Sequence, residues 1–396
     1  MRVAYVCADA GVPVFGRKGC SIHVQEVVRA LHSEGAEVDL FAACKGGPAP
    51  RGLEDVPLHA LPAAADVDLV RREDQAFAAN NAVPAGLEAE GPFDLVYERY
   101  SLWSAAGMEY ACEAGIPGLL EVNAPLIEEQ AAHRGLVNRT RAEWIASRAF
   151  SSADALLAVS QEVAAWLRRH PSAPGRVYVV PNGVNPERFP PGLPPSRPAP
   201  PGVFTVGFVG TLKPWHGLSV LVEAFALFHA QWPASRLLVV GDGPQRGDLE
   251  RALEAACLGG AAELTGGVSH QEVPGLLASM DAAVAPYPQS DSFYFSPLKV
   301  YEYQAAGLPV VASRVGQLAD LVEDGATGLL VQPGNAAALA RALDRLRRDP
   351  GLAARLGRAG RKRVAREHTW RAVAQRILSI GGLRPSATVA HLEERA

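Results

Sequence analysis

The sequence predicts an α/β protein with two domains, each built on a parallel sheet. Short apolar runs alternate with helical patterns along most of the 396 residues. The runs are nearly continuous rather than alternating, which is typical of parallel strands buried on both faces. The pattern restarts near residue 203, after a segment (190–202) that holds seven prolines in thirteen residues. Such a segment is a stiff spacer, so it predicts a domain boundary.

The first half predicts a βαβ opening followed by further strands. Val24, Val27, Val28 and Leu31 form one apolar stripe of a helix, and Gly35 is expected to end that helix. His23 lies off this stripe, which predicts that it faces the polar side. The expected strands are 2–8, 37–43, 94–97, 118–122, 155–159 and 177–180.

The second half repeats the arrangement. Leu218, Leu221, Val222 and Phe225 form another helical stripe. The expected strands are 203–209, 236–240, 282–285, 309–312 and 328–331. We therefore expect a first domain over 1–185, a linker over 186–202 and a second domain over 203–368. A final helix and a loose tail fill 369–396. Two such domains would face a central cleft, where the carboxyl ends of parallel strands bind ligands.

Composition excludes several classes of protein. A formal charge of -4 argues against a nucleic-acid binder, and 48% hydrophobic residues exclude general disorder. The five cysteines are scattered and form no CxxC pair, which fits a reducing cytoplasm. The N-terminus does not resemble a signal peptide, and no apolar run reaches 18 residues. We expect a cytoplasmic protein without a membrane span.

The strongest local motif is FYFSPLKVYEYQAAGLPVVAS, residues 293–313. Ser296 is a suitable N-cap and Pro297 a suitable first helical residue. The amides of Leu298 and Lys299, with the lysine charge, would then form an anion site for a diphosphate. Glu302 lies one turn deeper, where its carboxylate could accept hydrogen bonds from a ribose. The alternative is an ordinary capped helix with a solvent-facing lysine and glutamate.

Two further loops join a strand to a helix through glycines. In GFVGTLKPWHGLSVLVEAF (207–225), Gly210 and Thr211 open the loop, and Lys213 and His216 could reach a phosphate oxygen. The alternative is an ordinary loop with an exposed histidine. The segment VFGRKGCSIHVQEVV (14–28) carries Gly16, Arg17, Lys18 and Gly19 at a similar turn.

Other segments give weaker signals. VVGDGP (239–244), with Gly243, and ELTGGVS (263–269), with Gly266 and Val268, could read a base through backbone groups, but each could equally be a tight turn. Asp66 and Asp68 form a D-x-D within a charged amphipathic segment, which we interpret as a solvated face. We therefore predict no metal site.

Together these segments resemble glycosyltransferase family 4, the retaining nucleotide-sugar transferases of GT-B architecture, over about residues 1–380. PNGVNPERF (181–189), VGTLKPWHG, VVGDGP, TGGVS and FSPLKVYEYQAAGLPVVASRVGQLADLVEDGATGLLV carry the resemblance. The resemblance implies two Rossmann-like domains, the first for the acceptor and the second for the donor. No cofactor would be required; the donor would be a UDP-sugar, with a GDP-sugar as second choice.

The resemblance also implies roles for single residues. The segment at Leu298 and Lys299 would hold the diphosphate, Glu302 the ribose, and 265–268 the base. The loop at Gly16–Gly19 would close over the pyrophosphate and sugar, and a helix near Trp370 would cross back to the first domain.

The sequence departs from the family pattern at several positions. The first of two paired glutamates is replaced by Tyr294, with Asp291 as a substitute. The usual Arg and Lys of the phosphate loop are Thr211 and His216, so Lys213 and Lys299 would supply charge. The histidine that contacts the sugar corresponds to Asn123.

The predicted function is a metal-independent transfer of a sugar, with retention, to an acceptor hydroxyl. Lys299, Lys213 and His216 would stabilise the leaving diphosphate. The alternatives are a GT-B sugar-nucleotide epimerase and a non-catalytic nucleotide-sugar-binding partner. The acceptor could be a glycan, a lipid-linked sugar or a small molecule, and the oligomeric state is open. Four arginines near Trp144 could touch a membrane surface, or could simply lie on a solvated helix: Arg134, Arg139, Arg141 and Arg148.

Overall fold

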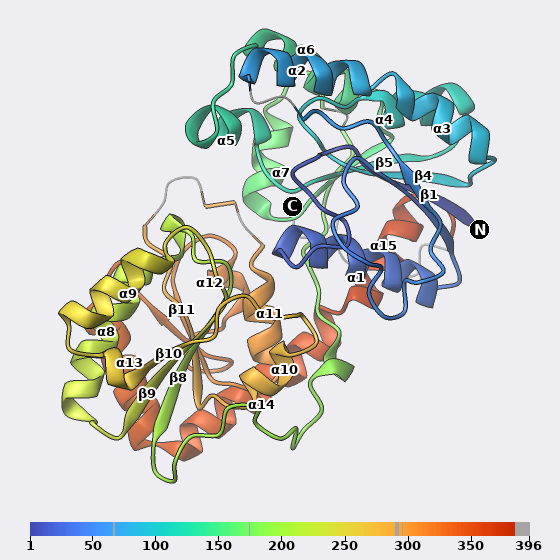
Figure 1. The fold of residues 1–396 in the computed structure, drawn as a ribbon. Helices are drawn as coiled ribbons and strands as arrows, with labels where there is room; N and C mark the ends of the chain where they lie inside the picture. The colour runs from blue at the N-terminus through green and yellow to red at the C-terminus, as the bar shows by residue number, and fades with distance from the viewer. Residues whose placement is uncertain (66–67, 174, 290–292, 295, 385–396) are drawn as a thin grey trace. The chain divides into compact units, whose positions relative to one another are not determined.

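The computed structural model describes residues 1–65, 68–173, 175–289, 293–294 and 296–384 (Figure 1). The chain divides into two compact units. The first comprises Met1–Asn182, Tyr294–Ser296 and Trp370–Ala396, and the second Gly183–Phe293 and Pro297–Thr369. Asp66, Asp291 and the tail beyond residue 384 lie outside the described residues.

The first unit is built on a parallel sheet of seven strands in the order β3-β2-β1-β4-β5-β6-β7. Val3 of the central β1 pairs with Val38 on one side and Leu95 on the other. Because both faces are covered, Val3–Cys7 are fully buried, as the apolar runs predict. The strands are β1 Arg2–Cys7, β2 Glu37–Ala42, β3 Leu58–Ala60, β4 Leu95–Arg99, β5 Gly118–Val122, β6 Ala155–Ala158 and β7 Val177–Val179.

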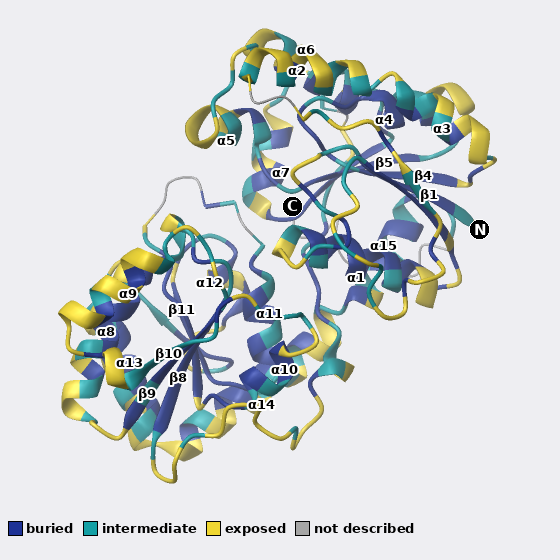
Figure 2. Ribbon diagram, in the orientation of Figure 1, coloured by how far each residue is buried: buried dark blue, intermediate teal, exposed yellow. Residues whose placement is uncertain are grey.

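Helices cover both faces of this sheet (Figure 1). α3, α4, α6 and α7 contribute to one core with the strands, and α1 packs with α15 on the other face. Figure 2 shows dark, buried strands between helices whose outer faces are exposed. The helices are α1 Gly19–Ser33, α2 Leu69–Ala79, α3 Ala82–Glu90, α4 Ala106–Ala114, α5 Leu126–His133, α6 Arg139–Ser152, α7 Gln161–Arg168 and α15 Trp370–Ile380.

α1 is buried along two of its sides rather than one. Gly35, at a φ of +84°, follows its last turn as predicted. The prediction that His23 faces the polar side is wrong, because His23 is only 4% exposed. The ring of Trp370, at the start of α15, packs edge-on against it at 5.2 Å. Glu34 also holds the two helices together, since it accepts a 2.8 Å hydrogen bond from the Arg371 Nε.

The second unit contains a parallel sheet of six strands in the order β10-β9-β8-β11-β12-β13. The proline-rich segment 190–202 packs on this unit, where the Ser196 N–H donates to the Gly275 carbonyl at 2.8 Å. The strands are β8 Phe204–Val209, β9 Ser235–Val240, β10 Ala262–Leu264, β11 Ala282–Ala285, β12 Val310–Ser313 and β13 Leu329–Val331.

Helices again form two layers around this sheet. α8, α9 and α13 share one core with the strands, and α11 packs against α14. The α-helices are α8 Leu218–Gln231, α9 Arg246–Ala255, α10 Val273–Leu277, α11 Leu298–Ala305, α12 Leu318–Leu321, α13 Ala336–Arg348 and α14 Pro350–Glu367. Three short 3-10 helices are η1 Pro186–Arg188, η2 Pro214–His216 and η3 Gly259–Ala261.

Two edge strands, β3 and β10, were not predicted from the sequence. Both are only three residues long, and each has a polar residue at its centre, His59 and Glu263, so neither forms a continuous apolar run. In each sheet the order reverses beside the first strand, between β1 and β4 and between β8 and β11. At such a reversal the loops after the two strands diverge and leave a crevice at their carboxyl ends.

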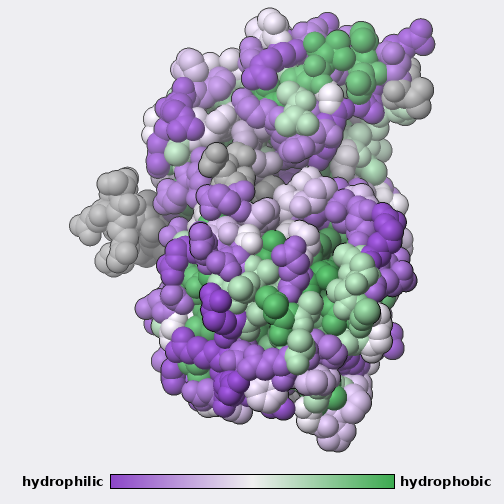
Figure 3. Space-filling view, turned by 90° about the vertical axis from the view of Figure 1, so that its left-hand side faces the viewer, coloured by the Kyte–Doolittle hydropathy of each residue, from purple (hydrophilic) through white to green (hydrophobic). Residues whose placement is uncertain are grey.

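On the face drawn in Figure 3, hydrophobic residues gather in patches that are surrounded by hydrophilic residues. Trp144 and Leu227 are among the large apolar side chains that remain about half exposed. Within the described residues, no helix is long and apolar enough to cross a membrane.

One buried carboxyl group makes the stability of the first unit depend on pH. Glu98, on β4, is completely buried, and burial raises its pKa to about 7 against the opposing hydrogen bond from Ser104. An unfolded chain ionises this group near pH 4.5, so the folded state binds the proton more tightly. Its contribution to stability is therefore complete below pH 4.5 and is lost as the pH rises through 7.

Replacing Glu98 with glutamine removes this titration. We expect the stability gained by Glu98→Gln to be about 2 kcal/mol larger at pH 8 than at pH 5. Urea unfolding at both pH values measures the difference, with the exposed Glu113→Gln as the control. An equal effect of Glu98→Gln at both pH values would contradict the assignment.

Candidate functional site

The loop after β8 is held by backbone contacts at the reversal of the second sheet. The Gly210 N–H donates to the Val240 carbonyl at 2.9 Å, and the Leu212 N–H donates to the Asp242 carbonyl at 2.9 Å. Gly210 has a φ of +143°, and a Cβ there would lie 2.9 Å from the Lys299 Nζ. Glycine is therefore needed both for the backbone conformation and for the close approach of the lysine.

Lys299 points its ammonium into this loop, where it has no hydrogen-bond partner among the described residues. The residue is 8% exposed, and Nζ lies 4.2 Å from the ring centre of Phe208 and 5.3 Å from that of Tyr287. Burial lowers the pKa of Lys299 to about 7. Burying a cation without a partner costs free energy, so we interpret the position of Lys299 as a binding site for an anion.

The N-terminus of α11 adds amide donors beside Lys299. The helix begins at Leu298, and the N–H groups of Leu298 and Lys299 have no acceptor within the helix. The expectation that Ser296 caps this helix is wrong: Pro297 occupies the cap position, without a side-chain hydrogen bond. The Ser296 hydroxyl instead accepts from the Asn182 N–H at 3.2 Å. The helix end and the lysine together favour an anion.

The other polar side chains of the loop carry different charges. Burial lowers the pKa of His216 to about 2, and the Lys299 ammonium acts in the same direction, so the ring is neutral. Its Nδ1 lies 2.6 Å from the Thr211 carbonyl, to which it donates. Lys213 places Nζ 5.4 Å from the centre of the Trp215 ring. The positive charge of this loop therefore comes from lysine rather than from His216.

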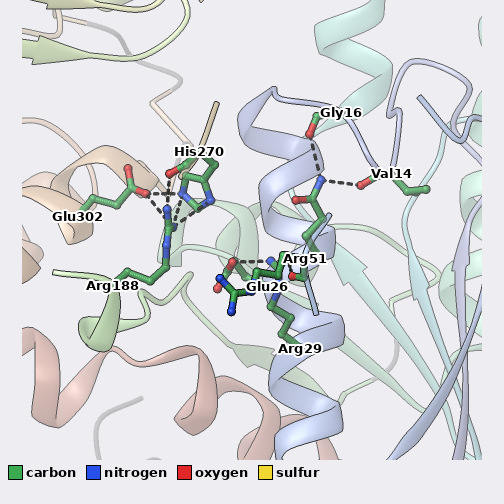
Figure 4. A network of polar contacts seen from close by, with 9 residues as sticks. Val14, Gly16, Glu26, Arg29, Arg51, Arg188, His270 and Glu302 are labelled. Atoms are coloured by element: carbon green, nitrogen blue, oxygen red, sulfur yellow. Dashed lines mark hydrogen bonds and ion pairs between the residues drawn. The ribbon is translucent and has the colours of Figure 1, made fainter. Parts of the chain in front are cut away.

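Glu302 is one turn further along α11 and is engaged by two side chains (Figure 4). Its Oε1 lies 2.7 Å from the His270 Nε2 and 3.9 Å from an Arg188 nitrogen. Arg188 is on η1 and His270 follows β10 in the turn before α10. The Glu302 side chain is 14% exposed, so it is not completely closed off from solvent.

Two turns at the ends of β9 and β10 lie against the same loop of the second unit. The Gly241 N–H donates to the Gly266 carbonyl at 3.1 Å, which joins the two turns. A Cβ on Gly243 would come within 2.6 Å of the Leu212 carbonyl oxygen. Val268 is half-buried beyond Gly266. The residues of the second unit that the sequence predicts for the donor site therefore lie around the carboxyl end of β8.

The glycine loop of the first unit is fixed by a residue that the sequence analysis did not single out. Gln25 is 4% exposed, and its Nε2 donates to the carbonyls of Val14 and Gly16, each at 3.0 Å (Figure 4). Arg17 remains exposed, and Gly19 begins α1. Gln25 lies beside the apolar stripe of α1 rather than within it, so the helical pattern gave no signal for its burial.

A buried polar cluster lies at the carboxyl ends of β4 and β5. Glu121 accepts from the Arg99 NH1 at 2.9 Å, from the Tyr97 hydroxyl and from the Asn123 amide. Burial lowers the pKa of His23 to about 4, so this ring is neutral and its Nε2 lies 3.3 Å from Glu121. Burial alone would raise the pKa of Glu121, but the Arg99 cation and the hydrogen bonds from Tyr97 and Asn123 bring it below its usual value. Asn123 is therefore oriented by this cluster.

Tyr294, at the position of the absent glutamate, pairs with a carboxylate of the first unit. Its hydroxyl donates to the Glu129 Oε2 at 2.8 Å, and the Ser160 hydroxyl donates to the Tyr294 carbonyl at 3.0 Å. Glu129 also accepts from Arg134 at 2.9 Å. Burial, with Glu129 acting in the same direction, raises the pKa of Tyr294.

The four arginines near Trp144 are paired with carboxylates. Arg134 pairs with Glu129, Arg139 with Glu143, Arg141 with Asp74 and Arg148 with Glu109. The Arg148 guanidinium also lies 4.5 Å from the centre of the Trp144 ring. These pairs neutralise much of the charge that a basic surface would need.

Comparison with known proteins identifies both halves of the chain. Residues 17–188 match the model described as Glycosyltransferase Family 4, and residues 203–349 match Glycosyl transferases group 1. The chain is 30% identical to a D-inositol 3-phosphate glycosyltransferase of Arthrobacter sp. (strain FB24), over 86% of this chain and 84% of that protein.

Solved structures share the fold. A sucrose-phosphate synthase from Thermosynechococcus elongatus superposes with a TM-score of 0.73 at 24% identity, over 96% of this chain and 98% of that one. Anabaena HepE, in complex with UDP and glucose, gives a TM-score of 0.70 at 19% identity, over 96% and 98%. The predicted architecture of two Rossmann-like, GT-B-type domains is confirmed.

Proposed function

The chain belongs to glycosyltransferase family 4, and from this premise we propose that it transfers a sugar from a nucleoside diphosphate to an acceptor hydroxyl with retention of configuration. The observation that carries the proposal is Lys299, a buried ammonium without a hydrogen-bond partner beside the free amides of a helix N-terminus. Such a place suits a diphosphate, which is the leaving group of this reaction.

The chemical problem is departure of the diphosphate from the anomeric carbon. Negative charge grows on the leaving oxygen, so Lys299, Lys213 and the amides of Leu298 and Lys299 lower the barrier by stabilising it. These groups supply the charge in a metal-independent reaction. His216, neutral and held by Thr211, orients the loop, and its second ring nitrogen can accept a hydrogen bond.

Retention requires that the acceptor attack from the side that the diphosphate leaves. We propose a front-face reaction, in which the leaving phosphate takes the acceptor proton and Asn123 contributes a contact to the sugar. Gly16, Arg17 and Gly19 belong to the loop that closes over the pyrophosphate, and such closure excludes water and aligns the reactants.

The donor is proposed to be a UDP-sugar, with a GDP-sugar as second choice. Support comes from HepE, which was solved with UDP and glucose. The base would lie against Gly243, Gly266 and Val268. The named acceptor of the Arthrobacter relative, D-inositol 3-phosphate, makes a phosphorylated polyol the first acceptor to test.

The proposal is tested by nucleotide release from UDP-, GDP-, ADP- and dTDP-sugars, with and without D-inositol 3-phosphate or a crude acceptor extract. Release from one donor class that rises with acceptor supports a transferase, and the configuration of the product tests retention. Conversion of the donor sugar without acceptor would favour an epimerase. Donor binding without turnover would favour a non-catalytic partner.

Replacing Glu302 is expected to weaken binding of the nucleoside diphosphate. Glu302→Ala should weaken nucleoside diphosphate binding by about tenfold or more, because the ribose hydroxyls lose a charged acceptor. Titration calorimetry with UDP measures this change, with the exposed Glu323→Ala as the control. An unaltered affinity would contradict the assignment of Glu302 to the ribose.

A further inference from the structure

Arg188, His270 and Glu302 come from three separate segments of the second unit and form one chain of contacts (Figure 4). Arg188 NH1 lies 2.9 Å from the His270 Nδ1 and 2.6 Å from its Nε2, and the His270 Nε2 lies 2.7 Å from the Glu302 Oε1. All three side chains are at least about four-fifths buried. Their arrangement is therefore fixed by the fold rather than by solvent.

The chemistry of the groups decides where the protons lie. Arginine can only donate and an ionised carboxylate can only accept. Since Glu302 can only accept, His270 donates to it from Nε2. The Arg188 nitrogen faces both ring nitrogens, and Nδ1 is the one left with a lone pair to accept from it. Arg188 also donates from its second terminal nitrogen to the His270 backbone carbonyl, so it holds both the ring and the turn.

The imidazole keeps Arg188 and Glu302 apart. The arginine nitrogen is 3.9 Å from Oε1, which is longer than a hydrogen bond. Without the ring, an arginine at this distance would close onto the carboxylate and engage both of its oxygens, the preferred geometry of that pair. With the ring in place, only Oε1 is used. The other oxygen is directed away from the cluster and carries no dashed contact in Figure 4.

We propose that His270, held by Arg188, is a positioning residue. It keeps the second oxygen of Glu302 free to accept hydrogen bonds from the ribose hydroxyls of the donor. Selectivity for a ribonucleotide over its deoxy analogues then depends on a residue that itself need not touch the nucleotide. This inference rests on the proposed function, because it assumes that Glu302 faces the donor ribose.

The test compares UDP with 2′,3′-dideoxy-UDP on the wild-type chain and on His270→Ala, by titration calorimetry. We expect the wild type to prefer UDP by about tenfold or more, since an accepting carboxylate is left unpaired by the deoxy analogue. In His270→Ala this preference should fall to less than about threefold, while dideoxy-UDP binding changes little. The pair of ligands isolates the ribose contact from general loosening of the site.

Two further variants sharpen the result. His270→Gln keeps one acceptor and one donor in place of the ring, so it should recover part of the preference. Arg314→Gln removes an exposed ion pair with Asp324 in the same unit, and should leave the preference unchanged. Thermal unfolding of each variant checks that it is folded.

The outcomes are distinct. A preference that survives in His270→Ala, or a wild type that binds UDP and dideoxy-UDP equally, would overturn the positioning role. If the wild type binds GDP rather than UDP, the same comparison is made with GDP and 2′,3′-dideoxy-GDP. If no nucleoside diphosphate binds the wild type, the proposed function itself fails.

Discussion

Replacing Lys299 with methionine is expected to stabilise the protein and to reduce its turnover by about a hundredfold or more. The two effects have opposite signs because one buried charge causes both. The ammonium lies close to the rings of Phe208 and Tyr287, and no described residue accepts a hydrogen bond from it. Methionine has a similar length and an apolar end, so it should fill the same space without the cost of burying a charge.

The size of the stabilisation follows from the same burial. Burial lowers the pKa of Lys299 from 10.5 to about 7, so holding the group in the fold at neutral pH costs on the order of 4 kcal/mol. Since rings close to the charge recover part of this cost, we expect Lys299→Met to raise the free energy of unfolding by about 1–3 kcal/mol. Urea unfolding at pH 7 measures it.

The loss of turnover has a separate cause. The leaving diphosphate would lose the buried cation that faces it, and contacts of this kind typically contribute a hundredfold or more to the rate. The exposed Lys362→Met on α14 is the matched control and should change neither quantity. A variant that turned over normally would remove Lys299 from the reaction. A variant less stable than the wild type would show that the contacts of the Lys299 ammonium more than offset the cost of burying it.

The strands that frame the site could be predicted because each is a short apolar run buried on both faces. β8 and β11, which flank the reversal of the second sheet, have burial patterns without an exposed position. The glycine loops could also be placed, since they follow directly from these strands. β3 and β10 were not predicted, because each three-residue strand has a polar residue at its centre, His59 and Glu263. The other two edge strands, β7 and β13, carry only apolar and aromatic residues and were predicted.

Local sequence patterns could not predict features that depend on residues distant in the chain. His23 is buried by Trp370, a residue more than three hundred positions away in the chain. Periodicity within α1 assigns only one buried face and cannot anticipate a second helix. Arg188 and His270 are likewise 82 residues apart, and nothing in either segment indicates the partner.

The Lys299 environment shows the same limit at the site itself. The sequence places a lysine at a helix N-terminus, where it is ordinarily solvated. Phe208 comes from β8 and Tyr287 from the loop after β11, and together they exclude water from Nζ. The charge was predictable, but its burial required the tertiary structure.

That burial leads to the second large effect: nucleoside diphosphate binding should be accompanied by proton uptake at Lys299. In the free protein burial lowers the pKa of this group to about 7, so near pH 8 most molecules carry the neutral amine. A diphosphate next to Nζ favours the ammonium and raises its pKa. The ligand therefore binds the protonated form, and each binding event at pH 8 should take up close to one proton.

The affinity should follow the pH with a defined sign. Below pH 7 the amine is already protonated, so the dissociation constant is nearly independent of pH at this group. Above pH 7 the dissociation constant should rise by about tenfold per pH unit, until the pKa of the bound state is reached. Titration calorimetry with UDP between pH 6 and 9, in buffers of different ionisation enthalpy, measures both the slope and the protons.

Lys299→Arg provides the matched comparison, because a guanidinium stays charged throughout this range. The variant should lose the steep dependence above pH 7 and take up no proton at this site, even if its affinity is lower for steric reasons. A wild type whose affinity is flat from pH 6 to 9 would mean that Lys299 is already fully charged in the free protein. An equal slope in the arginine variant would assign the titration to another group. The first such group to test is the terminal phosphate of UDP, which has its own second ionisation. Repeating the series with a UDP-sugar, which lacks this ionisation, separates the two.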